Sequence, residues 1–229
     1  MITFLPVFQP IKNVSDGSSL CAEVLSRWKT PDGRLHAPGQ LNLNRIDWRK
    51  IDRGVINYLL SHKKDIVKKI DHIFINVSAQ TLLDNAHFYQ WVDSIKELIE
   101  DGSLKVTIEI TEQVPDDLLE RRWCDIAIES ITMAIDDFGV CNSTFSRLKS
   151  FPWLYCKVEV AGIESLISDN AARIFIDAGI KLIAEKVETL DQANFASNRN
   201  ISLQQGYIHY KPLPIQSLML DVKESTYAY

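Results

Sequence analysis

The sequence lacks the features that mark membrane and exported proteins. No apolar run approaches the roughly 18 residues that a membrane span requires. The amino-terminal residues do not show a basic segment followed by a sustained apolar one, so no signal peptide is expected. The four cysteines have no CxxC spacing, which is typical of reduced thiols. We therefore expect a cytoplasmic protein that does not associate with a membrane.

An excess of basic residues and a flexible linker are also missing. There are 25 lysines and arginines against 30 aspartates and glutamates, giving a formal net charge of −5. Binding to extended nucleic acid needs a basic surface, so direct nucleic-acid binding is not expected. The same charge does not exclude a small phosphorylated ligand bound through metal ions. No segment rich in proline, glycine and serine divides the chain, which predicts a single domain over residues 1–229.

Short apolar segments alternate with longer amphipathic ones along the chain. This alternation predicts an α/β fold of the (β/α)8 barrel type, with a doubly wound open sheet as the alternative. The expected strands are residues 4–8, 20–25, 73–77, 104–110, 131–135, 154–158, 181–184 and 203–207. The expected helices are residues 51–69, 82–100, 116–130, 163–178, 190–198 and 215–223. Residues 38–49 are polar and receive no assignment.

Polar side chains lie within or at the ends of successive predicted strands. In a (β/α)8 barrel the carboxyl ends of the strands meet at one mouth, where these enzymes place their catalytic groups. Each polar residue alone is consistent with a satisfied side chain in a strand, but their recurrence favours a shared site. They are Glu23, Asn76, Glu109, Asp136, Asp137, Lys157, Glu185 and Gln205.

The central segment is Met133-Ala-Ile-Asp-Asp-Phe-Gly139, an apolar run that ends in two adjacent acids. Adjacent residues of a strand point to opposite faces, so Asp136 and Asp137 can approach one ion only where the strand has ended. Gly139 permits such a turn. Two neighbouring carboxylates repel unless a cation lies between them, and oxygen ligands suit Mg²⁺ or Mn²⁺. The alternative is an acidic turn in which Asp137 is the N-cap of the next helix.

Several motifs together resemble the EAL family of cyclic-di-GMP phosphodiesterases over nearly the whole chain. Cys21-Ala-Glu-Val-Leu-Ser-Arg-Trp28 stands where the family has Glu-Ala-Leu followed by Arg-Trp. The other matching segments, in chain order, are Phe8-Gln-Pro-Ile11, Asn76-Val-Ser-Ala79, Glu109-Ile-Thr-Glu112, Asp136-Asp-Phe-Gly139, Lys157-Val-Glu159, Ala184-Glu-Lys-Val-Glu188, Gln205-Gly-Tyr207 and Lys211-Pro212.

The resemblance implies a two-ion site for Mg²⁺ or Mn²⁺ that opens cyclic-di-GMP to linear pGpG. The implied metal ligands are Glu23, Asn76, Glu109, Asp136 and Asp137. The implied catalytic residues, which orient or deprotonate the attacking water, are Lys157, Glu185 and Gln205. The implied substrate-binding residues are Gln9, Arg27 and Pro212. Glu112 and Glu188 are implied to hold the loop after Asp137 in place.

The chain departs from the family pattern near this loop. Val140, Cys141 and Asn142 replace Thr-Gly-Tyr, Lys186 replaces a glycine, and Glu159 replaces an aspartate. A loop that misplaces Asp137 by about 1 Å is expected to cost about a hundredfold in rate.

The sequence therefore favours a stand-alone, degenerate EAL protein with weak or no hydrolysis. Such a protein would regulate motility, biofilm formation or virulence by binding a protein partner, for instance a flagellar transcriptional regulator. The alternative is an active, metal-dependent phosphodiesterase that tolerates the altered loop.

Overall fold

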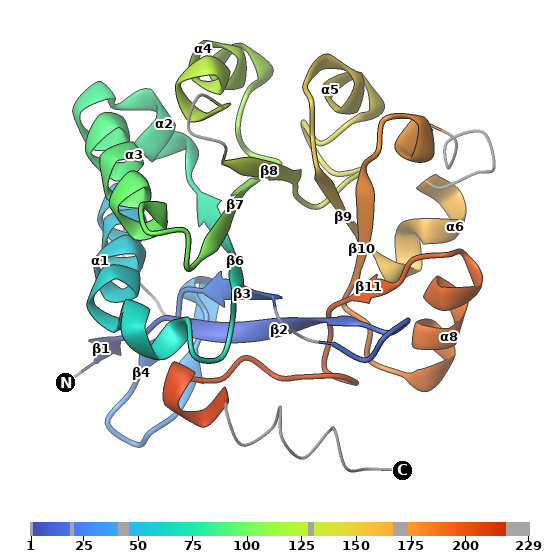
Figure 1. The fold of residues 1–229 in the computed structure, drawn as a ribbon, viewed down its shortest axis with the longest axis horizontal. Coiled ribbons are helices and arrows are strands. Elements are labelled where there is room, and N and C mark those ends of the chain that lie inside the picture. Colours follow the sequence, from blue (N-terminus) through green and yellow to red (C-terminus); the bar gives the residue numbers. More distant parts are fainter. Residues whose placement is uncertain (1, 19–20, 41–45, 128–130, 167–173, 219–229) are drawn as a thin grey trace.

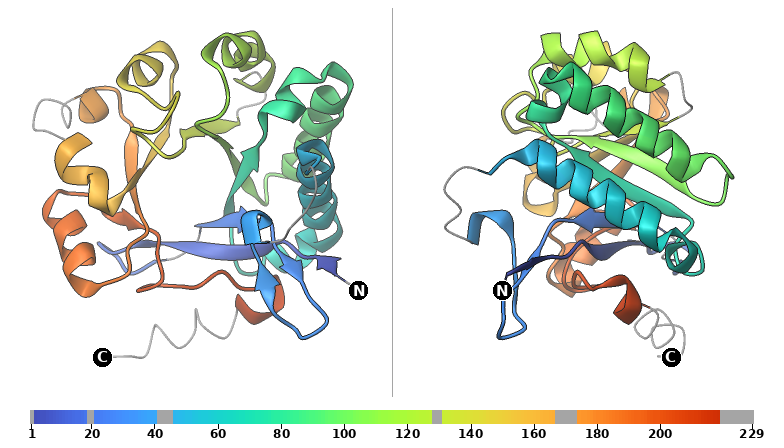
Figure 2. Two further views of the ribbon diagram at one scale, coloured as in Figure 1. Left: turned by 180° about the vertical axis from the view of Figure 1, so that it is seen from behind. Right: turned by 90° about the vertical axis from the view of Figure 1, so that its left-hand side faces the viewer.

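The computed structural model describes residues 2–18, 21–40, 46–127, 131–166 and 174–218. Eight strands form a closed barrel, and helices surround it on the outside (Figures 1 and 2). The strands follow one another around the barrel in the order β10, β11, β2, β3, β6, β7, β8 and β9. The prediction of a (β/α)8-type barrel is confirmed, and the open sheet is excluded. No described helix is long and apolar enough to cross a membrane.

The elements of the barrel have the following bounds. Its strands are β2 (Val7–Asn13), β3 (Cys21–Leu25), β6 (His72–Val77), β7 (Lys105–Ile110), β8 (Thr132–Ile135), β9 (Tyr155–Glu159), β10 (Lys181–Glu185) and β11 (Leu203–Gln204). The helices are α1 (Trp48–Ile66), α2 (Ala79–Leu83), α3 (Asn85–Ile99), α4 (Asp116–Ala127), α5 (Phe145–Ser150), α6 (Ile163–Leu166) and α8 (Leu190–Asn198), with 3-10 turns at Pro38–Gln40 and Val160–Gly162. A separate small sheet contains β1 (Thr3–Phe4), β4 (Trp28–Lys29) and β5 (Leu35–His36).

Strand β2 runs in the opposite direction to the rest of the barrel. It pairs antiparallel with both β3 and β11, whereas the other neighbouring strands are parallel. The start of β2 therefore lies at the same end of the barrel as the ends of the parallel strands. This reversal places Gln9, near the start of β2, directly opposite Glu23 in the register of β3.

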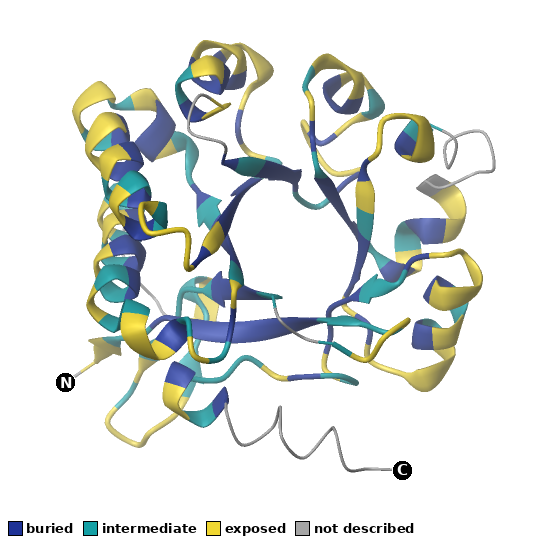
Figure 3. Cartoon of the chain, viewed as in Figure 1, coloured by how far each residue is buried: buried dark blue, intermediate teal, exposed yellow. Residues whose placement is uncertain are grey.

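The alternation of side chains along the strands divides the barrel interior into a polar layer at the mouth and an apolar layer at the base. Side chains two positions apart on a strand share a face, so an interior polar residue is accompanied by an interior residue closer to the base. Ile11, Phe74, Ala134, Tyr155 and Ile183 form an apolar cluster there, each two positions from a predicted site residue. A larger apolar core fills the space between the strands and the helices, whose outer faces are exposed (Figure 3).

Several predicted boundaries differ from the observed ones. The first barrel strand was expected to end at Gln9-Pro10, but it continues to Asn13. Pro10 remains within the strand, opposite Ala22 of β3. The helix predicted over residues 82–100 is two helices, since the side chain of Asp84 accepts a bond from His87 N and caps α3. The last strand is limited to Leu203–Gln204, and α5 was not predicted. Parts of the helices predicted at 116–130, 163–178 and 215–223 fall outside the described residues.

Gly206 lies against the backbone of Val187, which follows β10. A β-carbon at this position would lie 2.0 Å from the carbonyl oxygen of Val187 and 2.4 Å from its nitrogen. We expect Gly206→Ala to push the two segments apart and to lower the free energy of unfolding by about 3 kcal/mol, a fall of roughly 6–12 °C in Tm. Thermal denaturation measures this change. Gly39→Ala is the control, since its β-carbon would meet no atom within 4 Å, and an equal Tm for both variants would contradict the prediction.

Two of the family departures have a left-handed backbone that favours glycine. The φ angles are +45° at Cys141 and +54° at Lys186. Left-handed φ costs a residue with a β-carbon about 1–2 kcal/mol, part of which glycine loses again as chain entropy. We expect Cys141→Gly and Lys186→Gly each to raise the free energy of unfolding by about 1 kcal/mol and Tm by about 2–4 °C.

Asn200→Gly provides the matched comparison for these two variants. Asn200 also has a positive φ, of +61°, but asparagine adopts this conformation more readily than most residues. Its replacement should change Tm less than either of the other two. A lower Tm for Cys141→Gly would show that its thiol contributes more than its backbone costs.

Candidate active site

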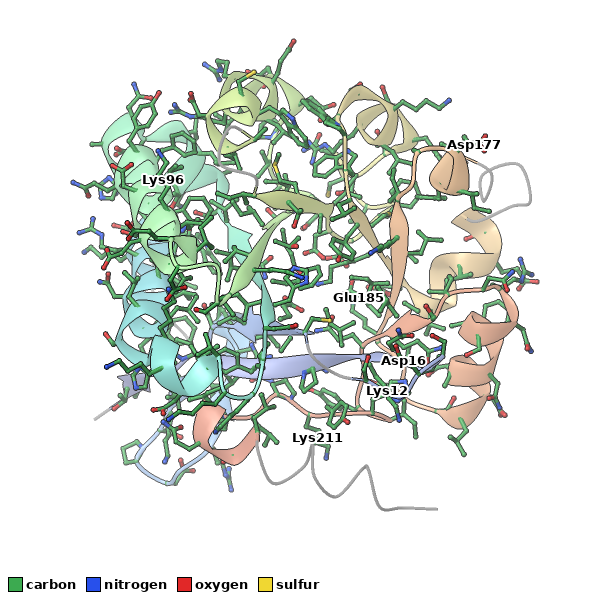
Figure 4. All side chains as sticks on the ribbon, in the orientation of Figure 1. Lys12, Asp16, Lys96, Asp177, Glu185 and Lys211 are labelled. Carbon is green, nitrogen blue, oxygen red and sulfur yellow. The ribbon has the colours of Figure 1, made fainter. Side chains whose placement is uncertain are left out.

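The buried ammonium group of Lys157 is the centre of the polar mouth. Its Nζ lies 3.1 Å from Glu23 Oε2, 2.9 Å from Glu109 Oε1, 3.3 Å from Asp136 Oδ1 and 2.8 Å from Glu185 Oε1. These five residues come from β3, β7, the end of β8, β9 and β10, and Glu185 lies on the inner side of the ring of strands (Figure 4). The structure thus brings together the acids that the sequence placed on separate strand ends.

Burial and mutual repulsion change the proton affinities of this group. Burial raises the pKa of Glu185 to about 8 and that of Asp136 to about 6, against the opposing charge of Lys157. Burial and the charge of Glu23 raise the pKa of Glu109 well above its usual value. Burial acts to lower the pKa of Lys157, but the surrounding carboxylates outweigh it and raise that pKa. Without another cation, some of these acids therefore keep their protons at neutral pH.

Amide side chains connect Glu23 to neighbouring strands. Asn76 Nδ2 donates to Glu23 Oε1 at 2.9 Å, and Gln205 Nε2 donates to Glu23 Oε2 at 2.7 Å. Gln205 Nε2 also lies 3.3 Å from Gln9 Oε1, and Gln9 Nε2 donates to the carbonyl oxygen of Tyr210 at 3.1 Å. Burial acts to raise the pKa of Glu23, but the charge of Lys157 and the hydrogen bond from Gln205 outweigh it and lower that pKa. Glu23 is therefore the acid of the group that stays ionised most easily.

Asp137 leaves the strand geometry and turns toward Asp136. Strand β8 ends at Ile135, and Asp137 has a φ of +43°, the left-handed region that a strand residue does not occupy. One carboxylate oxygen each from Glu112, Asp136 and Asp137 lies within 4.8 Å of the other two. The alternative prediction, that Asp137 is the N-cap of the next helix, is wrong: Thr144 caps α5 by accepting a bond from Arg147 N.

Hydrogen bonds fix the altered loop that follows Asp137. Asn142 donates to the carbonyl oxygen of Glu112 through its backbone N at 3.2 Å and through Nδ2 at 3.0 Å. Gly139 N donates to Ser143 O at 2.7 Å, and Ser143 N donates to Val140 O at 2.8 Å. The asparagine side chain therefore adds one bond to the segment just after β7, beside the bond that the backbone makes there.

Two residues that sequence analysis missed support the site from outside it. The carboxylate of Asp52, on the buried face of α1, accepts bonds from Ser78 N and Oγ and from Thr81 Oγ1, which fixes the start of α2 just after Asn76. Arg147, fully buried, donates to Val114 O and to Asp116 Oδ1. The signal for Asp52 was an acid within the apolar stripe of its helix, whereas nothing in the local sequence marked Arg147.

The other departures from the family pattern form a pair. Lys186 Nζ makes an ion pair with Glu159 Oε1, and both side chains are exposed at the mouth. Glu188, expected to hold the loop after Asp137, is exposed, and among the described residues only its backbone N has a recorded bond, to Gln192 Oε1 at 2.7 Å. The positive charge of Lys186 is therefore directed to Glu159.

The predicted substrate-binding residues lie around the mouth. A cavity of about 490 Å³ is lined by Arg27, Asn76 and Glu112, and by apolar side chains that include Trp48 and Ile51. Pro212 is half-buried and precedes a segment that pairs with the start of β2. The cavity thus combines a guanidinium group, an apolar wall, the predicted metal ligand Asn76 and the predicted loop-holding residue Glu112.

The donor set fits a hard divalent cation. Its candidate ligands are carboxylate and amide oxygens, which Mg²⁺ and Mn²⁺ prefer. Glu109 Oε1 faces Lys157 Nζ, but its Oε2 is buried without a hydrogen-bond partner among the described residues, so the site leaves an acceptor that a cation would satisfy. Four carboxylates around one ammonium also leave an excess of negative charge.

Comparison with known proteins places this arrangement in a family. The EAL domain family model matches residues 2–212. The cyclic di-GMP phosphodiesterase PdeL of Escherichia coli K12 is 28% identical over 229 residues, which cover 92% of this chain and 63% of PdeL. Klebsiella pneumoniae BlrP1, solved with manganese and cyclic-di-GMP, superimposes with a TM-score of 0.71 at 22% identity over 93% of this chain and 60% of BlrP1.

A second solved structure shares the same fold. Bacillus subtilis YkuI, which has an EAL domain and was solved with cyclic-di-GMP and calcium, gives a TM-score of 0.75 at 18% identity over 97% of this chain and 61% of YkuI. The chain thus spans less than two thirds of the length of each of these three proteins. From the family match over residues 2–212, the chain belongs to the EAL domain family.

Proposed function

We propose that the chain is a metal-dependent phosphodiesterase that hydrolyses cyclic-di-GMP to pGpG. The observation that carries this proposal is the convergence of Glu23, Glu109, Asp136 and Glu185 on Lys157, beside a cavity that contains Arg27. Family membership supports the substrate class, and the donor set supports the metal dependence. The ordered hydrogen bonds of Asn142 support a loop that keeps Asp137 beside Asp136.

The residues of the mouth have distinct roles in this reaction. Glu23, Asn76, Glu109, Asp136 and Asp137 would hold Mg²⁺ or Mn²⁺, which supplies a deprotonated water and stabilises charge on the attacked phosphate when bound. The guanidinium group of Arg27 binds phosphate oxygens through its planar fork.

Residues other than the candidate metal ligands carry out the proton transfer that accompanies hydrolysis. Glu185 accepts the proton of the attacking water, and Lys157 and Gln205 orient the groups around it. The water oxygen forms a bond to phosphorus, the bond from phosphorus to the ribose 3′ oxygen breaks, and that oxygen takes a proton from solvent water, while Glu185 later returns its proton to solvent. One of the two phosphodiester linkages of the ring is thereby opened, which gives the linear product pGpG.

The second candidate is a regulator that acts by binding another protein, with weak or no hydrolysis. The observation that favours it is Val140, an apolar residue that is 45% exposed on the altered loop. A partner protein that covers this side chain would remove its apolar surface from water. Within this proposal the partner is a transcriptional or motility regulator, and the process is motility or biofilm control.

A hydrolysis assay decides between the two candidates. Purified full-length chain is incubated with cyclic-di-GMP and Mn²⁺, and pGpG is followed by chromatography. We expect product from the wild type and at least a hundredfold slower formation by Glu23→Ala, which removes a candidate ligand and the partner of three side chains. Asp177→Asn, on the exposed outer rim (Figure 4), is the control. Equal inactivity of the wild type and Glu23→Ala would favour the regulator.

A further inference from the structure

We propose that Glu112 is a direct ligand of the cation held by Asp136 and Asp137, rather than a residue that fastens the loop. This inference rests on the proposed metal dependence of the site and adds a ligand that the family resemblance does not assign. It concerns the three-carboxylate group Glu112, Asp136 and Asp137 at the ends of β7 and β8.

The positions of the three carboxylates suit one small ion. Their oxygens lie within 4.8 Å of one another. Oxygens on opposite sides of an Mg²⁺ ion, each at ~2.1 Å, are about 4.2 Å apart. Neighbouring ligands of such an ion are only about 3 Å apart, so binding would draw the three carboxylates toward one another by rotation of their side chains.

The charges of the group are only partly compensated within the protein. Lys157 forms an ion pair with Asp136, together with Glu23, Glu109 and Glu185. Within the described part of the chain, neither Asp137 nor Glu112 has an ion pair with a lysine or arginine. Lys186, the extra cation near this part of the mouth, is paired with Glu159. The excess charge is thus located where the two acids face Asp136.

The loop does not use the carboxylate of Glu112. Asn142 bonds to the main-chain oxygen of Glu112, so the carboxylate is left free of this contact. Val140 has no hydroxyl to offer it. Oε1 of this carboxylate accepts a hydrogen bond at 2.8 Å from Nε2 of Gln113, its neighbour in the chain.

A second, independent observation points to a cation at this end of the barrel. Glu109 is fully buried; its Oε1 faces Lys157 Nζ at 2.9 Å, whereas its Oε2 has no hydrogen-bond partner among the described residues. Asp136 Oδ1 approaches the same Nζ at 3.3 Å. Asp136 therefore shares its ammonium group with an acid that has an unpartnered oxygen, and it also lies beside Asp137 and Glu112. Unsatisfied buried oxygens beside grouped carboxylates indicate a hard divalent cation.

Direct binding of Mn²⁺ to the full chain, without substrate, tests the inference. We expect the wild type to bind two ions by calorimetry and by electron paramagnetic resonance. Glu112→Gln should keep one ion and bind the other at least tenfold more weakly, since an amide is a poorer ligand than a carboxylate. Glu97→Gln, an exposed residue on the outer helix α3, is the matched control and should behave as the wild type.

Hydrogen exchange of residues 137–144 separates a ligand from a loop anchor. Glu112→Gln retains the main-chain oxygen that binds Asn142, so we expect loop protection in the absence of metal to be unchanged. Asn142→Ala removes one of those bonds and should reduce this protection.

Three outcomes would overturn the inference: two Mn²⁺ ions bound with unchanged affinity in Glu112→Gln, fewer than two ions in the wild type, or loss of loop protection in Glu112→Gln. The outcome is distinct from that of the hydrolysis assay. A wild type that binds two ions in a Glu112-dependent manner but forms no pGpG would contradict the proposed function and support the ligand.

Discussion

The ion pairs of Lys157 are the constraint on which the mouth of the barrel depends. Four carboxylates within 3.3 Å of one buried ammonium group would repel one another strongly without it. Burial of charge is costly, and a buried ion pair that loses one partner leaves the other uncompensated. Because the four acids come from different strands, this single side chain connects β3, β7, β8 and β10 through β9. The remaining negative charge is what makes the same site suitable for divalent cations.

The barrel brings these groups together through two simple geometrical rules. Side-chain alternation sends every second residue inward, so the apolar cluster at Ile11, Phe74 and Tyr155 fills the base and the polar groups fill the mouth. The reversal of β2 then adds Gln9, which would lie at the opposite end in a parallel strand. Asp137 is the exception to alternation, since it joins Asp136 only by adopting a left-handed backbone. The position of Asp137 therefore depends on a loop, whereas the group around Lys157 depends on strands.

This difference explains what could be predicted from the sequence. The strand-end acids were predicted because alternation and the parallel order of strands are encoded locally, and the structure brings Glu23, Glu109, Asp136 and Glu185 together as expected. The direction of β2 was not predicted, although the connection between Asn13 and Cys21 is too short for a parallel crossover and so requires antiparallel pairing with β3. The contacts of Asn142 and Arg147 were also missed, since both donate to carbonyl oxygens, which every residue type supplies, and the other partner of Arg147, Asp116, lies 31 residues away in the chain.

The family departures bear more on stability than on the arrangement of the site. A residue other than glycine at positive φ costs about 1–2 kcal/mol, and Cys141 and Lys186 both have this conformation. Nevertheless, the loop containing Cys141 has two bonds from Asn142 to Glu112, and Lys186 is paired with Glu159, another departure. Asn142 anchors the loop by bonding to the main chain of Glu112, whereas the side chain of Glu112 was expected to hold the loop. A loop anchored in this way leaves the Glu112 carboxylate available to face Asp136 and Asp137, so the altered residues change what that acid can bind.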